Sequence, residues 1–183
     1  MKKIISLFQR NYDGDHQVRD EIVPGAEWVV AGEGVATEKI DGTACLVQDG
    51  KLYRRYGANL GKTTPQGFIP AQGPDETTGH WPGWVLVTSD PGDKWHVEAW
   101  DAVDYVLPDD TYELVGPKVQ GNPYGLDRHE LWRHGTRVII NEPRDFEGLR
   151  DFLTHDHIEG IVWHRANGDM VKIKARDYGI KWS

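Results

Sequence analysis

The sequence predicts an α+β protein made mostly of antiparallel sheets, with a few helices. Short clusters of apolar and β-branched residues recur with an alternation of period two, which is typical of half-buried strands. The tight-turn dipeptides Asp49-Gly50 and Asn167-Gly168 lie between such clusters and predict hairpins over 43–56 and 160–174. Helical periodicity is confined to two segments. Short strands joined by tight turns pair antiparallel, because parallel strands need a long crossover connection.

Local patterns predict the individual elements. Strands are expected at 28–31, 43–47, 51–56, 84–88, 112–115, 137–140, 160–164 and 170–174. A first helix is expected at 94–107, with Asp93 as its N-cap and Pro108 as its stop, and a second at 145–154, because apolar residues in both fall on one helical face. Residues 57–83 are rich in Gly, Pro, Thr and Gln without periodicity, so we expect a long loop.

Composition narrows the class of protein. A chain of 183 residues can bury a core without disulfides, and we predict a single domain over 1–183. It has no apolar run near ~18 residues and no secretory leader pattern, so we expect a soluble, cytoplasmic protein that uses no membrane. The lone cysteine, Cys45, excludes an intrachain disulfide framework. A net charge of −8 disfavours the binding of nucleic acid to the surface as a whole, so any polyanion must be bound by a local basic patch.

Two weak motifs are set aside. The stretch GANLGKTT at 57–64 resembles a phosphate-binding P-loop, but it has three residues between its glycines instead of four and leads into Pro65 and Gly67 instead of a helix. His155 and His157 would share a face on a strand, yet they follow a predicted helix end and lack a third metal ligand at a recognisable spacing. We therefore interpret the second stretch as a polar turn.

Basic residues on the predicted strands carry more information. Lys172 and Lys174 are two residues apart, so both side chains project from the same face, and Glu159 precedes the strand that pairs with theirs. Two ammonium groups on one face either bind an anion or decorate a solvated edge. Arg54 and Arg55 point to opposite faces, so at most one of them can share a site with other strands.

Another lysine, Lys39, lies between two carboxylates, Glu38 and Asp41, and is followed by Gly42 in the stretch ATEKIDGTAC. A solvated surface lysine needs no such neighbours, and a buried one requires a charged partner or loss of its charge. Lys39 is therefore either an ion-paired strand residue or a residue that takes part in chemistry.

Five short motifs occur in a fixed order along the chain. They are K-x-D-G at 39–42, R-x-G at 55–57, Y-E-L-V-G at 112–116, E-G-I-V at 159–162 and K-I-K at 172–174. In this order they resemble the nucleotidyltransferase motifs of the covalent superfamily of ATP-dependent DNA ligases, RNA ligases and mRNA capping enzymes. The resemblance implies sheets of the nucleotidyltransferase type, as in the ATP-grasp-like adenylation domain of ligases.

A narrower family is indicated by three longer stretches. EWVVAGEGVATEKIDGTA, YELVGPKVQGNPYGLDRH and EGIVWH…KIKARDYG are similar to the small ATP-dependent 5′-to-3′ RNA ligase family that includes a vertebrate RNA ligase. The sequence ends nine residues after Lys174, so we expect no OB-fold domain. This favours an RNA ligase over the alternatives: a DNA ligase, a capping-type guanylyltransferase, or a degenerate nucleotide- or RNA-binding module.

The resemblance also implies a mechanism and a set of residues. Lys39 would attack the α-phosphorus of ATP to form lysyl-AMP, the AMP would move to an RNA 5′-phosphate, and an RNA 3′-hydroxyl would displace it. Lys172 and Lys174 would contact the α-phosphate, Glu113 the ribose hydroxyls, and Glu159 a metal or the Lys39 amine. The implied residues around ATP are Glu38, Asp41, Gly42, Arg55, Glu113, Trp132, Glu159, Lys172 and Lys174, with Trp132 as the candidate for the ring stacked on adenine.

The implied cofactors are ATP and a divalent metal, Mg²⁺ or Mn²⁺, with Glu159 and Glu113 as the metal-facing carboxylates. The implied partner is RNA with 5′-phosphate and 3′-hydroxyl ends. Glu38 and Asp41 would stabilise a charged ammonium if they stood beside the Lys39 amine, although the attacking amine must be neutral. We therefore expect Lys172, Lys174 and the metal to oppose these carboxylates.

Overall fold

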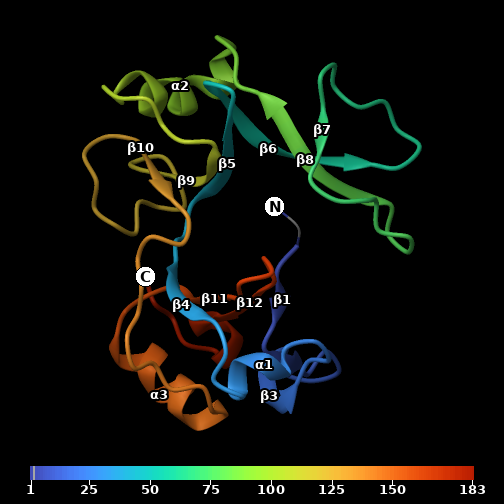
Figure 1. The fold of residues 1–183 in the computed structure, drawn as a ribbon, viewed down its shortest axis with the longest axis vertical. Coiled ribbons are helices and arrows are strands. Elements are labelled where there is room, and N and C mark those ends of the chain that lie inside the picture. The colour runs from blue at the N-terminus through green and yellow to red at the C-terminus, as the bar shows by residue number, and fades with distance from the viewer. Residues whose placement is uncertain (2) are drawn as a thin grey trace. The chain divides into compact units, whose positions relative to one another are not determined.

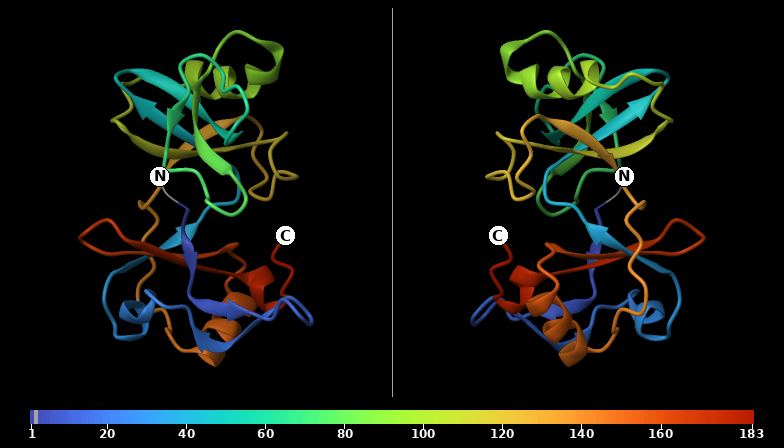
Figure 2. Two further views of the ribbon diagram at one scale, coloured as in Figure 1. Left: turned by 90° about the vertical axis from the view of Figure 1, so that its right-hand side faces the viewer. Right: turned by 90° about the vertical axis from the view of Figure 1, so that its left-hand side faces the viewer.

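The structure, a computed structural model, describes residues 1 and 3–183 and confirms the predicted class. Its sheets are mostly antiparallel and its helices few (Figures 1 and 2). The described residues form two compact units. Unit 1 contains residues 1, 3 and 41–134, and unit 2 contains residues 4–40 and 135–183. Assignment of the whole chain to one domain stays a prediction.

Unit 1 is built on a six-stranded sheet in the order β10-β9-β5-β6-β8-β7 with antiparallel neighbours throughout. Its elements are β5 (Thr43–Gln48), β6 (Lys51–Asn59), β7 (Ile69–Pro70), β8 (His80–Leu86), η1 (Pro91–Asp93), α2 (Lys94–Asp101), β9 (Asp110–Val115) and β10 (Glu130–Arg133). One face of the sheet buries Cys45, Tyr112 and Leu114 in a core that includes Ala99 of α2. Because side chains alternate along a strand, Glu113 lies on the opposite face.

Unit 2 contains a four-stranded sheet in the order β1-β12-β11-β4 and a two-stranded ribbon, β2-β3. Its elements are β1 (Ile5–Ser6), β2 (Phe8–Arg10), β3 (Val18–Ile22), α1 (Glu27–Val30), β4 (Val35–Lys39), α3 (Phe146–His155), β11 (Gly160–His164), β12 (Met170–Lys174) and η2 (Ala175–Tyr178). Alternate residues of β11 and β12, such as Ile161 and Ile173, pack in one core with Leu149 and Leu153 of α3. The predicted hairpins 43–56 and 160–174 are both confirmed.

Helices show where local patterns were sufficient. Helix α3 is close to its prediction, and the Asp145 side chain caps it by accepting a hydrogen bond from the Gly148 amide at 2.9 Å. Helix α2 ends at Asp101 rather than at 107, and its predicted cap, Asp93, accepts bonds from the backbone and hydroxyl of Thr88 instead. Leu107 is still buried, although an irregular segment delivers it to the core. The apolar spacing thus identified buried positions beyond the end of the helix.

Two strand predictions and one loop prediction were wrong or incomplete. Residues 28–31 lie mainly in helix α1, because a short apolar run does not distinguish a buried helix from a strand. Residues 137–140 form an isolated bridge from Val138 to Thr37 instead of a strand. The expected loop at 57–83 contains the end of β6, all of β7 and the start of β8. Gly83 permits that pairing, since a Cβ there would lie 2.4 Å from the Ile69 carbonyl oxygen.

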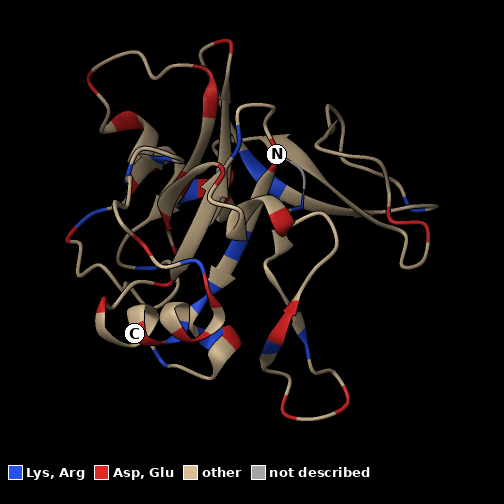
Figure 3. Ribbon diagram, turned by 60° about the horizontal axis from the view of Figure 1, so that its bottom comes forward, with Lys and Arg blue, Asp and Glu red and all other residues tan. Residues whose placement is uncertain are grey.

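Charged residues of both signs are distributed along the chain (Figure 3), and the excess of acidic residues gives the net charge of −8. Cys45 is fully buried, and burial raises the pKa of its thiol, as expected for an inert strand residue. Over the described residues, no helix combines the length and the apolar character needed to cross a membrane.

Candidate active site

The lysine of the K-x-D-G motif lies at the end of β4. Its neighbour across the sheet is Gly160 of β11, and Gly160 in turn pairs with Lys174 of β12. The Lys39 ammonium nitrogen Nζ lies 2.7 Å from Oε2 of Glu159, with side-chain exposures of 23% and 10%. Glu159 is therefore the ion-pair partner of Lys39. The sequence identified both residues but not their contact.

A glycine is required between the two lysines. A Cβ at Gly160 would lie 2.1 Å from the Ile173 carbonyl oxygen and 2.9 Å from the Lys174 Cα. Real side chains do not approach this closely, so only glycine allows β11 and β12 to pair at this row. With neighbouring strands about 4.8 Å apart, Lys39 and Lys174 have Cα positions roughly 10 Å apart. Long lysine side chains can converge over that distance.

Lys172 belongs to the same face of the sheet. It pairs with Val162, which pairs with Thr37 on β4, two residues before Lys39. The pKa of Lys172 is lowered to about 8, mainly by burial and then by the charges of Lys174 and Lys39. Burial is also the main cause of the lowered pKa of Lys174. The predicted shared face is confirmed, and the three ammonium groups on it repel one another.

Glu38 points elsewhere. Adjacent strand residues face opposite sides, and the Glu38 carboxylate lies 3.4 Å from Nη1 of Arg137. Glu38 is thus paired with an arginine, whereas Glu159 supplies the carboxylate at the Lys39 amine.

Sequence reasoning missed the residues that fix the end of β12. The fully buried Asp177 accepts a hydrogen bond from the Lys174 backbone amide at 2.9 Å, and it also pairs with Arg10 of β2. The Glu159 carbonyl accepts a bond from the Ala175 amide at 2.8 Å. These contacts hold the backbone on both sides of Gly160. In the sequence, Asp177 and Arg10 are recognisable only as an acidic and a basic residue, and such residues are too common to predict that they pair.

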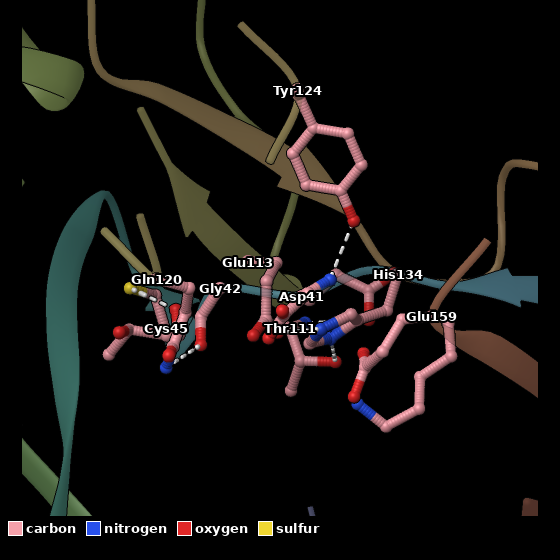
Figure 4. Close-up of polar contacts among 12 residues, drawn as sticks. Asp41, Gly42, Cys45, Thr111, Glu113, Gln120, Tyr124, His134 and Glu159 are labelled. Atoms are coloured by element: carbon pink, nitrogen blue, oxygen red, sulfur yellow. Dashed lines mark hydrogen bonds and ion pairs between the residues drawn. The ribbon is translucent and has the colours of Figure 1, made fainter. Parts of the chain in front are cut away.

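Unit 1 holds the remaining predicted residues. Glu113 of β9 is 9% exposed, and its Oε2 lies 2.6 Å from Nε2 of His134, which follows β10. The other ring nitrogen of His134 lies 2.9 Å from the Thr111 hydroxyl oxygen (Figure 4). The sequence contains no signal that distinguishes His134 from the other histidines, such as His155 and His157.

The residues after Lys39 are held by a loop of unit 1. The Asp41 backbone amide donates to the Tyr124 hydroxyl at 2.7 Å, and Nε2 of the Gln120 side chain donates to the Gly42 carbonyl oxygen at 3.4 Å (Figure 4). A Cβ at Gly42 would lie 2.3 Å from the Leu114 carbonyl oxygen and 2.7 Å from the Glu113 Cγ. The close approach that requires glycine at this position is therefore to β9.

Two further predicted residues contact aromatic rings. The Arg55 guanidinium lies 4.7 Å from the centre of the Trp84 ring and donates to the Met1 carbonyl at 3.1 Å, and burial lowers its pKa. Trp132 pairs with Glu113 across the sheet, so both side chains share a face, and its ring lies 4.7 Å from that of Tyr124. Trp132 is half-buried.

No group of three or more His, Cys, Asp or Glu side chains that could hold a metal ion occurs within residues 1 and 3–183. Mg²⁺ usually keeps several waters and takes only one or two protein carboxylates together with substrate phosphates. A single carboxylate such as Glu159 therefore fits Mg²⁺ that arrives with a nucleotide, whereas a preformed metal cage does not occur in the described part of the chain.

Comparison with known proteins identifies the family. The family model for RNA ligase 1 matches residues 102–183. RNA ligase 1 of Rattus norvegicus is 30% identical over 226 residues, an alignment that covers 81% of this chain and 68% of the rat protein. The chain belongs to the RNA ligase 1 family. RNA ligase 1 of Mus musculus is 29% identical over 224 residues, with 81% and 68% covered, and that of Danio rerio 29% over 227 residues, with 80% and 68% covered.

Membership in the RNA ligase 1 family confirms the resemblance found in the sequence. The match to the family model includes Glu113, Glu159, Lys172 and Lys174. It begins at residue 102 and therefore does not include Lys39. Alignments to the vertebrate RNA ligase 1 proteins are longer than this chain, so those relatives contain internal segments that have no counterpart here.

Proposed function

We propose that this chain is an ATP-dependent RNA ligase that joins RNA 5′-phosphate and 3′-hydroxyl ends, with Lys39 as its nucleophile. The observation that carries the proposal is the pairing of Lys39 with Glu159 on the sheet face that also carries Lys172 and Lys174. A lysine among other cations, with one carboxylate at its amine, is suited to attack a phosphate. Membership in the RNA ligase 1 family supports RNA as the substrate.

The proposed reaction has three phosphoryl transfers. In the first, the neutral Lys39 amine forms a bond to the α-phosphorus of ATP, the bond to the β-phosphate oxygen breaks, and pyrophosphate leaves. In the second, an RNA 5′-phosphate oxygen attacks that phosphorus, the N–P bond breaks, and Lys39 regains its proton. In the third, an RNA 3′-hydroxyl loses its proton and attacks the RNA 5′-phosphorus, the bond from that phosphorus to the bridging oxygen of the AMP group breaks, and AMP leaves.

Glu159 is the residue best placed to accept the proton of the Lys39 ammonium group. Its carboxylate accepts a hydrogen bond from Nζ at 2.7 Å, which is within the range for direct proton transfer. Lys172 and Lys174 lie on the same face, and the charges of Lys39 and Lys174 help to lower the pKa of Lys172. The same two lysines would compensate the charge of the α-phosphate once the nucleotide is bound.

A divalent metal, Mg²⁺ or Mn²⁺, would be held at Glu159, and it would supply charge neutralisation on the phosphates. The assignment of Glu113 as a second metal-facing carboxylate stays a prediction. We assign Glu113 first to the ribose hydroxyls, and Trp132 to the adenine ring. Arg55, Asp41 and Gly42 stay predicted ATP-binding residues, and the nucleotidyltransferase type of fold is part of this proposal.

Intact-mass measurement after incubation with ATP and Mg²⁺ tests the nucleophile. We expect one AMP adduct on the wild-type chain and none on Lys39→Ala, because Lys39 is the proposed nucleophile. Lys51→Ala, a change at an exposed lysine of β6, is the matched control and should keep the adduct. An adduct that survives Lys39→Ala contradicts the assignment.

Joining assays separate the candidate functions. The pre-adenylylated chain should join 5′-phosphorylated RNA, and DNA with the same ends should be joined poorly. Attachment of label from GTP instead of ATP would favour a guanylyltransferase, and efficient joining of DNA would favour a DNA ligase. Binding of ATP without any adduct would favour a degenerate binding module.

A further inference from the structure

His134 is held more firmly than its place just after β10 requires. Its backbone amide donates to the Thr111 carbonyl at 3.1 Å, and its ring nitrogen Nδ1 lies 2.9 Å from the Thr111 hydroxyl oxygen. Its Nε2 lies 2.6 Å from Oε2 of Glu113. Thr111 and Glu113 are two residues apart on β9 and share a face, so one strand anchors both nitrogens of the ring.

These contacts fix the position of the proton on the ring. An ionised carboxylate only accepts hydrogen bonds, so Nε2 carries a hydrogen and donates it to Glu113. The Thr111 hydroxyl can donate to Nδ1 or accept from it, and therefore fits either charge state of the ring. A charge-assisted bond of this length is among the stronger ones in proteins, and it restricts rotation of the Glu113 carboxylate.

Glu113 is restrained on another side by the K-x-D-G motif. A Cβ at Gly42 would lie 2.7 Å from the Glu113 Cγ, so the backbone there packs directly on the side chain. The only hydrogen bond found to the Glu113 carboxylate within residues 1 and 3–183 comes from His134, at Oε2. Oε1 accepts none from these residues, and it does not occur among the fully buried atoms that lack a partner. One oxygen is therefore held by the protein, and the other is left to accept from a ligand.

We propose that His134 is a positioning residue that holds Glu113 so that its second oxygen recognises a sugar hydroxyl of the nucleotide. This inference rests on the proposed function, because it takes ATP as the ligand. A buried carboxylate fixed in one orientation rejects a sugar that lacks the matching hydroxyl, since its oxygen is then left without a partner. His134 thereby sets selectivity for ATP over a deoxynucleotide without touching the nucleotide.

Kinetics of AMP-adduct formation with ATP, 2′-deoxy-ATP and 3′-deoxy-ATP test the inference. In the wild type, the analogue that lacks the recognised hydroxyl should have a KM about tenfold above that of ATP, the range for a hydrogen bond to a charged group. In His134→Ala, KM for ATP should rise about tenfold with little change in kcat, whereas KM for that analogue should change by less than about threefold. The variant therefore loses the selectivity.

Conservative variants separate positioning from a merely structural role. His134→Gln keeps an N–H donor at the same distance from the backbone and should restore most of the selectivity. His155→Ala makes the same change at an exposed histidine and should leave both KM values unaltered. If His134→Ala does not fold, Thr111→Val serves in its place, because it frees Nδ1 and should reduce the selectivity in the same direction.

Three results overturn the inference. Equal increases in KM for ATP and both deoxy analogues would show a general structural effect, and unchanged selectivity in His134→Ala would show no role. A wild type that forms the adduct equally well from all three nucleotides would refute recognition of a sugar hydroxyl by Glu113. A wild type that forms no adduct with ATP would instead refute the proposed function itself.

Discussion

Lys172 should give adenylylation an alkaline limit. Its pKa is lowered to about 8, first by burial and then by the charges of Lys174 and Lys39. The charged fraction at that pKa falls about tenfold between pH 7 and pH 9. If the Lys172 charge binds the phosphates of ATP, kcat/KM for AMP-adduct formation should fall above about pH 8, approaching tenfold per pH unit. The profile of kcat/KM reports the free enzyme, which is the state that the structure describes.

Stability should change in the opposite direction over the same range. The folded-state pKa of Lys172 is below its ordinary value of 10.5, so the unfolded chain binds more protons between about pH 8 and 10.5. The free energy of unfolding contributed by this group therefore rises with pH in that window. A fall in kcat/KM that accompanies increased stability cannot be explained by alkaline unfolding.

Initial rates at low ATP concentration between pH 6.5 and 10, roughly the range over which this lysine titrates, provide the assay. Lys172→Arg stays charged throughout, because a guanidinium loses its proton only above about pH 12, so its alkaline limb should disappear. Lys51→Arg, at an exposed lysine, is the control and should keep the wild-type profile. A wild-type profile that is flat above pH 8, or a Lys172→Arg variant with the same limb, would refute the reasoning.

Three further predictions follow from single contacts. Glu159→Gln keeps the shape but loses the proton acceptor at Lys39, so adduct formation should slow about 100-fold or more, while Glu21→Gln on the exposed ribbon should have no effect. Gly160→Ala places a Cβ 2.1 Å from the Ile173 carbonyl oxygen and should destabilise the fold by about 3 kcal/mol in urea unfolding, whereas Gly73→Ala, with open space around it, should cost less than about 0.5 kcal/mol. RNA joining should be lost at lower salt than adduct formation. The exposed basic residues that could bind RNA phosphates are Lys62, Arg176 and Lys181, whereas Arg54 is paired with Asp93. Three phosphate contacts would give a slope of about −2 in log K for RNA binding against log salt. A common salt dependence of both activities, an unimpaired Glu159→Gln or an equally stable Gly160→Ala would contradict the respective prediction.

The sequence predicted hairpins well because their signals are local. Asp49-Gly50 and Asn167-Gly168 determine the turn and thereby the register of the strands on either side. The strand that carries Lys39 was missed, since β4 reads V-A-T-E-K and has too few apolar residues to stand out. Its conformation comes from pairing with β11, which lies about 120 residues away in the chain (Lys39 to Glu159 is a separation of 120). The β-propensity of a short segment carries no information about a strand partner so far away in the sequence.

Candidate residues were easier to find than their contacts. The resemblance of the ordered motifs to those of the nucleotidyltransferase superfamily named Lys39, Glu113 and Glu159, but motif order does not determine which carboxylate reaches which cation. Alternation along β4 directs Glu38 away from Lys39 and toward Arg137, so the nearest carboxylate in the sequence is not the partner in the structure. His134 was invisible for the same reason, because its role depends on the register that β10 and β9 adopt.

The lysine face of unit 2 is unfavourable to the folded protein in the absence of a ligand. Lys172 and Lys174 both have a lowered pKa caused mainly by burial, which means that their charged forms are less stable here than in water. Glu159 offsets the charge of Lys39 but leaves an excess of positive charge on the face. Natural sequences retain such a cost where a ligand removes it, and an anion between these lysines would do so. Lysines on a solvated sheet edge would not have a pKa lowered by burial, as Lys172 and Lys174 do. The interpretation of these lysines as a solvated edge therefore does not account for this face.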